Sequence, residues 1–129
     1  MTMDEQAARA KVSTIADRLG KPIDEGIRET CVWLLVAGFE IVQSCEGHAG
    51  YPEPYPWVQF EAADNTPAGN APHRERMASL LREGCGLVME DHGMLGAFRV
   101  APSPSLRNSG DIAANRERML ALARRAAGQ

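Results

Sequence analysis

The residue types best suited to chemistry lie together in the segment Ser44-Cys45-Glu46-Gly47-His48. Gly47 allows a sharp turn that would return His48 towards Cys45. A nearby imidazolium lowers the pKa of a thiol, which would make Cys45, His48 and Glu46 the catalytic residues of a hydrolase. The Cys45-x-x-His48 spacing also suits two ligands of one zinc ion. The alternative to both is a buried structural cysteine with a histidine that satisfies loop backbone.

A metal site would need more ligands than this segment supplies. The other candidates are His73, Cys85 and His92, and none of them lies at a short spacing from another. His92 is better explained as a residue of a hairpin turn, and His73 as a histidine on a helix face. We therefore expect neither a metal nor a cofactor. If a metal binds, Cys45 and His48 would hold it.

The segment that follows is rich in aromatic residues and proline. Three aromatic residues between positions 51 and 57 alternate with prolines at 52, 54 and 56. The prolines stiffen this loop, and its rings could stack on a planar ligand or form a lid over the sheet. Arg99, predicted within a strand, could pair with a phosphate or a carboxylate, or simply face solvent. The predicted ligand-binding residues are Ser44, Cys45, His48, Tyr51, Tyr55, Trp57 and Arg99.

Hydrophobic periodicity predicts the elements that must position these residues. Apolar residues at helical spacing, from Ala8 to Leu19, indicate a helix over 4–19. A second helix, capped by Asp24 and ended by Gly38, would bury Cys31 as an inert core thiol. Further helices are expected over 72–83 and from 111 onward, strands over 39–44, 57–62, 87–91 and 95–101, and a polar turn region over 64–71. In the first strand, Phe39, Ile41 and Gln43 are expected on one face.

The predicted order α-α-β-β-α-β-β-α indicates a single domain over residues 1–129. We expect an α+β fold with a four-stranded, mainly antiparallel sheet and helices on one face. The other face would then be left open, or be covered by the first helix or by a second subunit. An apolar face of that kind on a small chain predicts a homo-oligomer.

Charge and composition exclude several classes of protein. The net charge of −3 makes duplex nucleic acid an unlikely partner. Residues 1–66 carry a net charge of −6 and residues 67–129 a net charge of +3. The longest apolar run, 31–38, is far shorter than the roughly 20 residues of a membrane span. Three cysteines without a recognisable signal peptide predict free thiols in a reducing, cytoplasmic environment.

The motifs of several common enzyme classes are missing from the sequence. There is no P-loop, no G-x-G-x-x-G after a strand, no H-E-x-x-H and no G-x-S-x-G. These absences argue against common nucleotide hydrolases, dehydrogenases, zincins and serine esterases. The final helix is basic through Arg116, Arg118, Arg124 and Arg125, which indicates either a solvated face or a surface that docks an acidic partner.

Part of the chain resembles a known group of proteins. The resemblance rests on Gly26-Ile-Arg-Glu-Thr, Leu35-x-x-Gly38-Phe39-Glu40, the Ser44–His48 segment and Pro56-Trp57-Val58-Gln59-Phe60. These runs resemble small uncharacterised proteins carried by phages and prophages. The resemblance covers residues 24–61 and implies a viral or mobile-element origin, without implying an activity.

Three hypotheses for the function follow from these patterns. The first is a non-enzymatic protein that binds a small anionic planar ligand, such as a nucleotide; a phage-encoded sponge of a host signal is one form of this hypothesis. The second is a hydrolase that uses Cys45 and His48, or a metal held by them. The third is a structural or interaction protein that docks through its basic last helix.

Overall fold

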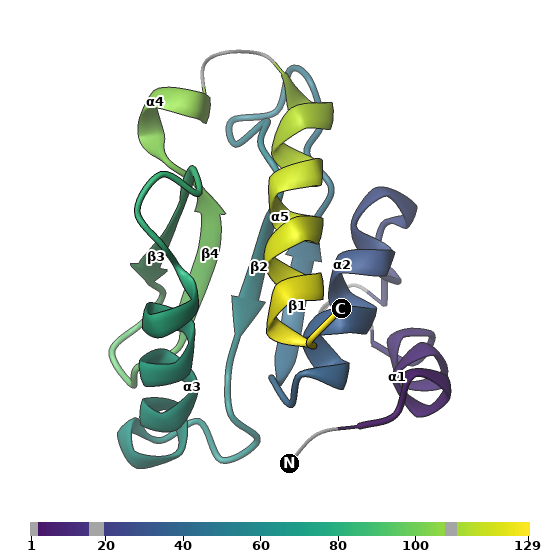
Figure 1. Ribbon diagram of the computed structural model, residues 1–129, viewed down its shortest axis with the longest axis vertical. Coiled ribbons are helices and arrows are strands. Elements are labelled where there is room, and N and C mark those ends of the chain that lie inside the picture. The colour runs from purple at the N-terminus through teal and green to yellow at the C-terminus, as the bar shows by residue number, and fades with distance from the viewer. Residues whose placement is uncertain (1–2, 16–19, 108–110) are drawn as a thin grey trace.

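The computed structural model describes residues 3–15, 20–107 and 111–129. Its four strands form one sheet in the order β1-β2-β4-β3, and every neighbouring pair is antiparallel. This confirms the predicted α+β fold and its order of elements, to which the structure adds one short helix, α4 (Figure 1). The elements are α1 (Glu5–Val12), α2 (Glu25–Val36), β1 (Ile41–Cys45), β2 (Trp57–Phe60), α3 (Pro67–Leu80), β3 (Leu87–Asp91), β4 (Phe98–Pro102), α4 (Pro104–Arg107) and α5 (Ile112–Ala126).

The second helix, α2, is the centre of the packing. It contacts α1, α5 and β1, and Figure 1 shows it side by side with α5 across the sheet. Ile27, Cys31 and Leu34 on its inner face are at most 1% exposed, as their helical spacing predicts. The helix ends at Val36, and Gly38 follows with a φ of +95° that suits glycine.

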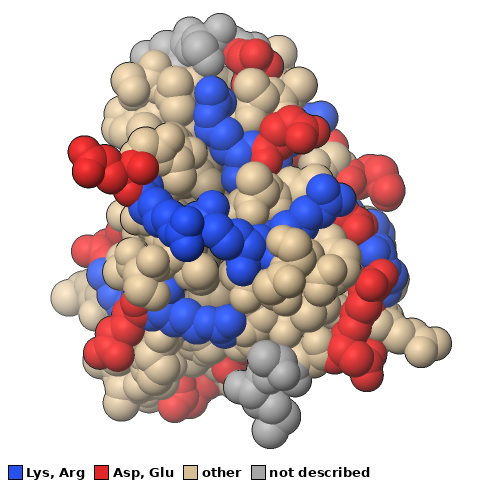
Figure 2. All heavy atoms as spheres, viewed as in Figure 1, with Lys and Arg blue, Asp and Glu red and all other residues tan. Residues whose placement is uncertain are grey.

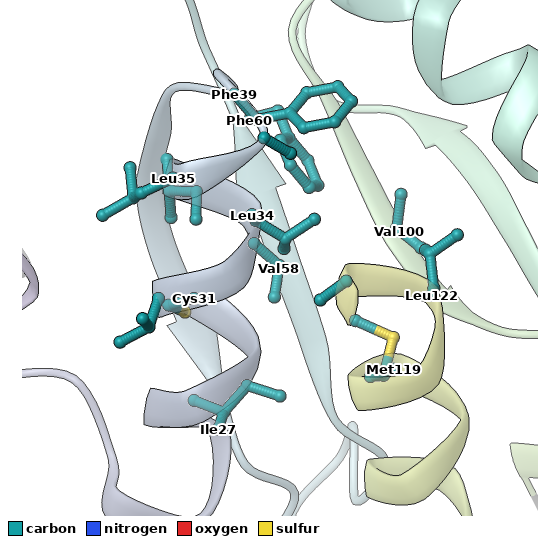
Figure 3. Packing of buried hydrophobic residues seen from close by; sticks show 14 of the residues in the cluster. Ile27, Cys31, Leu34, Leu35, Phe39, Val58, Phe60, Val100, Met119 and Leu122 are labelled. Atoms are coloured by element: carbon teal, nitrogen blue, oxygen red, sulfur yellow. The ribbon is translucent and has the colours of Figure 1, made fainter. Parts of the chain in front are cut away.

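The hydrophobic core lies between α2, α5 and the sheet (Figure 3). Leu34 of α2, Val58 of β2 and Met119 of α5 are all at most 1% exposed. Phe60 stacks on Phe98 with ring centroids 4.9 Å apart, which joins two neighbouring strands. Each such side chain contributes about 1.5–3 kcal/mol on burial, so this core rather than the loops supports the fold.

Three local predictions differ from the structure. Helix α1 ends at Val12, before the predicted residue 19; Leu19 itself lies outside the described residues. The pairing of β1 with β2 shifts between Ile41 and Gln43, so that Gln43 is exposed rather than on the face of Ile41. Helix α3 begins at Pro67 and not at 72, which makes most of the predicted 64–71 turn helical.

The early start of α3 has a clear local cause. The Thr66 hydroxyl accepts a hydrogen bond from the Gly69 amide at 3.0 Å and caps the first turn. Pro67 occupies the start of the helix, where a missing N–H costs nothing. Pro72 then lies inside the helix. Proline is best tolerated in the first turn of a helix, and the sequence prediction therefore started the helix at Pro72.

The second face of the sheet, which the sequence left open or covered by the first helix or a second subunit, is partly covered by side chains of its own strands. Trp57 and Gln59 of β2 point to this side and are each 8% exposed. Gln59 is paired in register with Arg99 of β4, whose guanidinium covers the Trp57 ring. The homo-oligomer was predicted from an uncovered apolar face, and this cover weakens that argument. The oligomeric state stays a prediction, which light scattering can measure. Among the described residues, no helix is both long and apolar enough to cross a membrane.

The three cysteines should differ sharply in reactivity. Cys31 is 0% exposed, and burial raises the pKa of its thiol to about 12. Cys45 and Cys85 are only partly buried. We expect iodoacetamide at pH 8 to modify Cys45 and Cys85 in the folded protein, and Cys31 only after denaturation. Peptide mass spectrometry would measure this order, and modification of Cys31 before Cys45 would contradict the assignment.

Candidate functional site

A cavity of about 340 Å³ lies beside β1 and opens to solvent. Its walls come from the segment before α2, from β1, from the start of β2, from β4 and from the loop between β1 and β2, residues 46–56, here called the proline loop. Segments far apart in the sequence therefore meet at this cavity. Six of the seven predicted ligand-binding residues line it: Ser44, Cys45, His48, Tyr51, Trp57 and Arg99.

A tight turn after β1 returns the chain towards the cavity. Gly47 has a φ of +86°, and a Cβ there would lie 2.7 Å from the Pro54 carbonyl oxygen. Glycine is therefore required on both conformational and steric grounds. With this turn, a ring nitrogen of His48, Cys45 Sγ and a carboxylate oxygen of Asp24 all come within 4.8 Å of one another.

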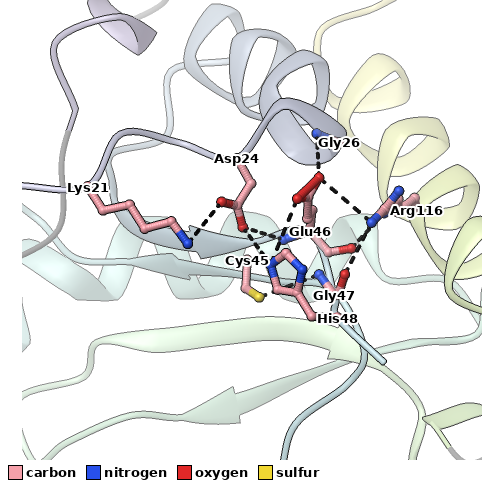
Figure 4. A network of polar contacts seen from close by, with 8 residues as sticks. All are labelled: Lys21, Asp24, Gly26, Cys45, Glu46, Gly47, His48 and Arg116. Atoms are coloured by element: carbon pink, nitrogen blue, oxygen red, sulfur yellow. Dashed lines mark hydrogen bonds and ion pairs between the residues drawn. The ribbon is translucent and has the colours of Figure 1, made fainter. Parts of the chain in front are cut away.

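Near the start of α2, the side chains of Asp24 and Glu46 each contact the chain segment that carries the other (Figure 4). Asp24 is the N-cap residue by position, but its carboxylate makes no capping hydrogen bond to α2. Asp24 Oδ2 instead accepts from the Glu46 amide at 3.3 Å and lies 3.2 Å from His48 Nε2. Glu46 Oε1 in turn accepts from the Gly26 amide at 2.9 Å, at the N-terminus of α2. Each carboxylate thus holds the other residue's segment, and Asp24 faces the cavity.

Arg116 of α5 fixes the same turn from the other side. Its Nε donates to the Glu46 carbonyl at 2.6 Å, and its Nη2 donates to the Gly47 carbonyl at 3.1 Å. Its Nη2 also lies 3.7 Å from Glu46 Oε1. Glu46 was predicted as a catalytic residue of a hydrolase, but its carboxylate contacts the helix terminus and Arg116. In this arrangement, Glu46 positions the turn after β1.

The electrostatics of the cavity do not favour a reactive thiolate. Burial raises the pKa of the Cys45 thiol; the Gly47 amide, which donates to Sγ at 3.4 Å, lowers it, and the Asp24 carboxylate raises it further. Nucleophilic cysteines have lowered pKa values in electropositive surroundings. Burial would also raise the pKa of Asp24, but hydrogen bonds from the Glu46 amide and His48, with Lys21 nearby, hold it below its usual value. Asp24 is therefore ionised at neutral pH.

Arg99 and Trp57 form one composite surface at the cavity. The Arg99 guanidinium lies over the Trp57 ring, with Cζ 3.8 Å from the ring centroid. Arg99 also donates to Gln59 at 3.3 Å and to the Glu53 carboxylate at 3.2 Å. Since one face of Trp57 is covered by Arg99, this indole supports the cation rather than offering a free platform for stacking.

Tyr51 and Tyr55 have different environments. Tyr51 is 58% exposed, and its ring centroid lies 4.8 Å from that of His48 at the cavity. Tyr55, the seventh predicted residue, does not line this cavity but a second hollow near Arg107. The Arg107 guanidinium covers the Tyr55 ring at 4.5 Å. Tyr55 therefore anchors the proline loop to the segment after β4.

Ser44 is the weakest of the six candidates that line the cavity. It pairs with Val58, whose side chain is fully buried in the core, and directly opposed residues of antiparallel strands share a face. Cys45 pairs with Trp57 on the opposite face. The thiol thus lies on the cavity side of the sheet, and the Ser44 side chain on the core side.

Sequence reasoning missed three charged residues of the site. Lys21, Asp24 and Glu53 all line the cavity, and Asp24 was predicted only as a helix cap. The remaining chemical candidates lie elsewhere: His73 Nε2 is 3.5 Å from a Glu40 oxygen, and the Cys85 thiol donates to the Leu87 carbonyl. A polar residue just before a helix is the usual sign of a cap, so nothing in the neighbouring sequence indicates that Asp24 belongs to the site.

The basic last helix is largely engaged within the chain. Figure 2, in the same view as Figure 1, shows Lys and Arg side chains gathered across the middle of the face that α5 occupies. Arg116 binds the Gly47 turn, Arg118 donates to Asn115 at 2.7 Å, and Arg125 donates to the Leu80 carbonyl at 2.6 Å. These contacts orient three of the four arginines within the chain and leave their positive charge in place, so an acidic partner stays a prediction.

Comparisons of the chain with protein-family models, with curated proteins and with solved structures find no match in any of the three. The resemblance of residues 24–61 to phage-carried proteins therefore stays a prediction.

Two glycines of the proline loop provide a matched test of the turn. Gly47 and Gly50 have φ values of +86° and +84°, but a Cβ at Gly50 would meet nothing within 4 Å. Gly50→Ala should cost roughly 1–2 kcal/mol of unfolding free energy through left-handed strain alone. Gly47→Ala should cost roughly 1–3 kcal/mol more, since its methyl group has no room. Urea denaturation measures both, and equal losses would show that the turn is not tightly packed.

Proposed function

We propose that this chain is a binding protein for a small anionic ligand with a planar group, such as a nucleoside monophosphate. The observation that carries the proposal is the convergence of Cys45, His48, Tyr51, Trp57 and Arg99 on one cavity. Its volume of about 340 Å³ lies at the lower end of the range for small-molecule sites, roughly 300–1,000 Å³. A small number of polar groups on a partly apolar wall is typical of such sites.

The anionic group of the ligand would bind at Arg99. This guanidinium is held in place by the Trp57 ring beneath it and by Gln59 beside it. Its carboxylate partner, Glu53, is half exposed and belongs to the proline loop. A phosphate can replace that carboxylate, because it offers the same acceptor geometry with more charge. Glu53 thus occupies the ligand's place in the free protein and competes with it.

The planar group of the ligand would lie against Tyr51. This ring is the one large aromatic side chain of the proline loop that is mostly exposed, and it sits beside His48 at the cavity. Stacking of a base on an aromatic ring contributes about 1–3 kcal/mol and tolerates different bases. Binding without catalysis is favoured over thiol chemistry because burial raises the pKa of Cys45. Sequestration of a nucleotide signal would be one use of such binding.

Two arginines offer a matched test of the anion site. Arg99 covers Trp57 and pairs with Glu53, while Arg107 covers Tyr55 and pairs with Glu90 at 2.5 Å, outside the cavity. Calorimetric titration with AMP should show binding that Arg99→Gln weakens by about 1.5–3 kcal/mol and Arg107→Gln leaves unchanged. Adenosine should bind more weakly than AMP, and added salt should weaken AMP alone. Equal effects of the two substitutions would contradict an anion site at Arg99.

Three further substitutions should act in predictable directions. Glu53→Gln should tighten AMP binding, because it removes the carboxylate that competes for Arg99. Tyr51→Ala should weaken binding by about 1–3 kcal/mol with little loss of stability. Tyr55→Ala should instead lower the melting temperature and leave binding intact, since its ring lies under Arg107. If Tyr51→Ala destabilised the fold without weakening binding, the loop would be a lid for the core.

A further inference from the structure

Three side chains of different chemistry meet at one end of the proline loop. Asp24 precedes α2, Cys45 ends β1 and His48 follows the Gly47 turn, and all three line the cavity. One donor atom from each lies within 4.8 Å of the other two. Within the part of the chain that the structure describes, no other group of three His, Cys, Asp or Glu residues comes together in this way.

The donor set and its spacing suit a zinc ion. Zinc binds thiolate at about 2.3 Å and imidazole or carboxylate at about 2.0–2.2 Å, so tetrahedral ligand atoms stand roughly 3.3–3.6 Å apart. His48 Nε2 and Asp24 Oδ2 already lie 3.2 Å apart. Cys45 Sγ lies within 4.8 Å of both atoms, so it would need to approach them by up to roughly 1.2–1.5 Å to complete the triangle, which is within the reach of side-chain rotation. A thiolate and a carboxylate would together balance the charge of a divalent cation.

The surroundings hold these donors in orientation. The Gly47 amide donates to Cys45 Sγ at 3.4 Å, and the Glu46 amide donates to Asp24 Oδ2 at 3.3 Å. Outer hydrogen bonds of this kind orient ligands in metal sites and are worth 10–100-fold in affinity. Arg116 fixes the backbone that supplies both amides. The donors thus belong to a supported arrangement and not to three independent surface side chains.

We propose that Asp24, Cys45 and His48 bind one divalent zinc-class ion, with its fourth coordination position open to the cavity. Three protein ligands and one open position distinguish catalytic from structural zinc sites. Water would fill that position, or an anionic oxygen of a bound ligand would replace it; only this last role rests on the proposed function. The proposal departs from the expectation of no metal because the fold adds Asp24 to the two ligands that the sequence supplied.

Cobalt provides the direct test, because Co²⁺ replaces Zn²⁺ and absorbs light. The purified full chain, reduced and freed of metal, should take up one equivalent of Co²⁺ with a thiolate-to-cobalt charge-transfer band and intense tetrahedral d–d bands. One equivalent of Zn²⁺ should abolish both. Cys45→Ser should remove the charge-transfer band, and Asp24→Asn and His48→Gln should each weaken Zn²⁺ binding at least tenfold. Circular dichroism would establish that each variant is folded.

Two substitutions outside the site serve as controls. Cys85 is also a partly buried free thiol, and His73 also lies near a carboxylate, that of Glu40. Cys85→Ser and His73→Ala should leave the cobalt spectrum and the Zn²⁺ affinity unchanged. A wild-type chain without the charge-transfer band would overturn the proposal. So would a band that survives Cys45→Ser or disappears in Cys85→Ser.

The proposals of a metal site and of a ligand site can be tested independently. Titration with the metal alone tests the metal site, and titration of the metal-free chain with AMP tests the binding proposal. If both hold, one equivalent of Zn²⁺ should tighten AMP binding in the wild type and not in Asp24→Asn. If Zn²⁺ binds without changing the affinity for AMP, the ligand does not occupy the open coordination position. The assignment of the three protein ligands would still stand.

Discussion

Arg116 donates hydrogen bonds to two successive carbonyls of the turn after β1, and this contact fixes the turn that brings His48 to the cavity. It ties α5, a core helix, to a loop that has little apolar packing of its own. The turn can approach so closely only because residues 26 and 47 are glycines: a Cβ at Gly26 would lie 2.4 Å from Glu46 Oε1. The turn that carries His48 is thus supported by the core through one guanidinium and two missing side chains.

The same contact explains why Asp24 is available for chemistry. An N-cap residue normally gives its carboxylate to the first turn of its own helix, a contribution of about 1 kcal/mol. Here Glu46, held beside the helix terminus by Arg116, accepts a hydrogen bond from the Gly26 amide at that terminus. An anion at a helix N-terminus is favoured wherever it comes from along the chain. The capping requirement of α2 is therefore met from the proline loop, and Asp24 turns to His48 without loss to the helix.

Local patterns could predict most of the fold and only part of the site. The stripe of Ile27, Cys31 and Leu34 and the alternation of Val58 and Phe60 depend on neighbours along the chain, and the structure has them as predicted. The start of α3 was wrong because the prediction placed Pro72 in the first turn, whereas the local start signals are the Thr66 cap and Pro67. Asp24 and Glu53 were missed because their roles arise from contacts with residues 24 and 46 positions away. Helical or strand periodicity carries no information about such pairs.

The polar walls explain why the cavity is not filled by collapse of the proline loop. Arginine–aromatic contacts at Trp57 and Tyr55 attach the loop at two points, so its ends cannot move far. Closing the space between them would take the Asp24 carboxylate, the Arg99 guanidinium and the half-exposed Glu53 out of water, at several kcal/mol for each ion that is not fully paired. Burying the apolar atoms of this wall, at about 25 cal/mol per Å², cannot offset such a cost. An occupant with its own charged groups can replace the water that solvates these ions, and this property of the wall supports the proposal that the cavity binds a ligand.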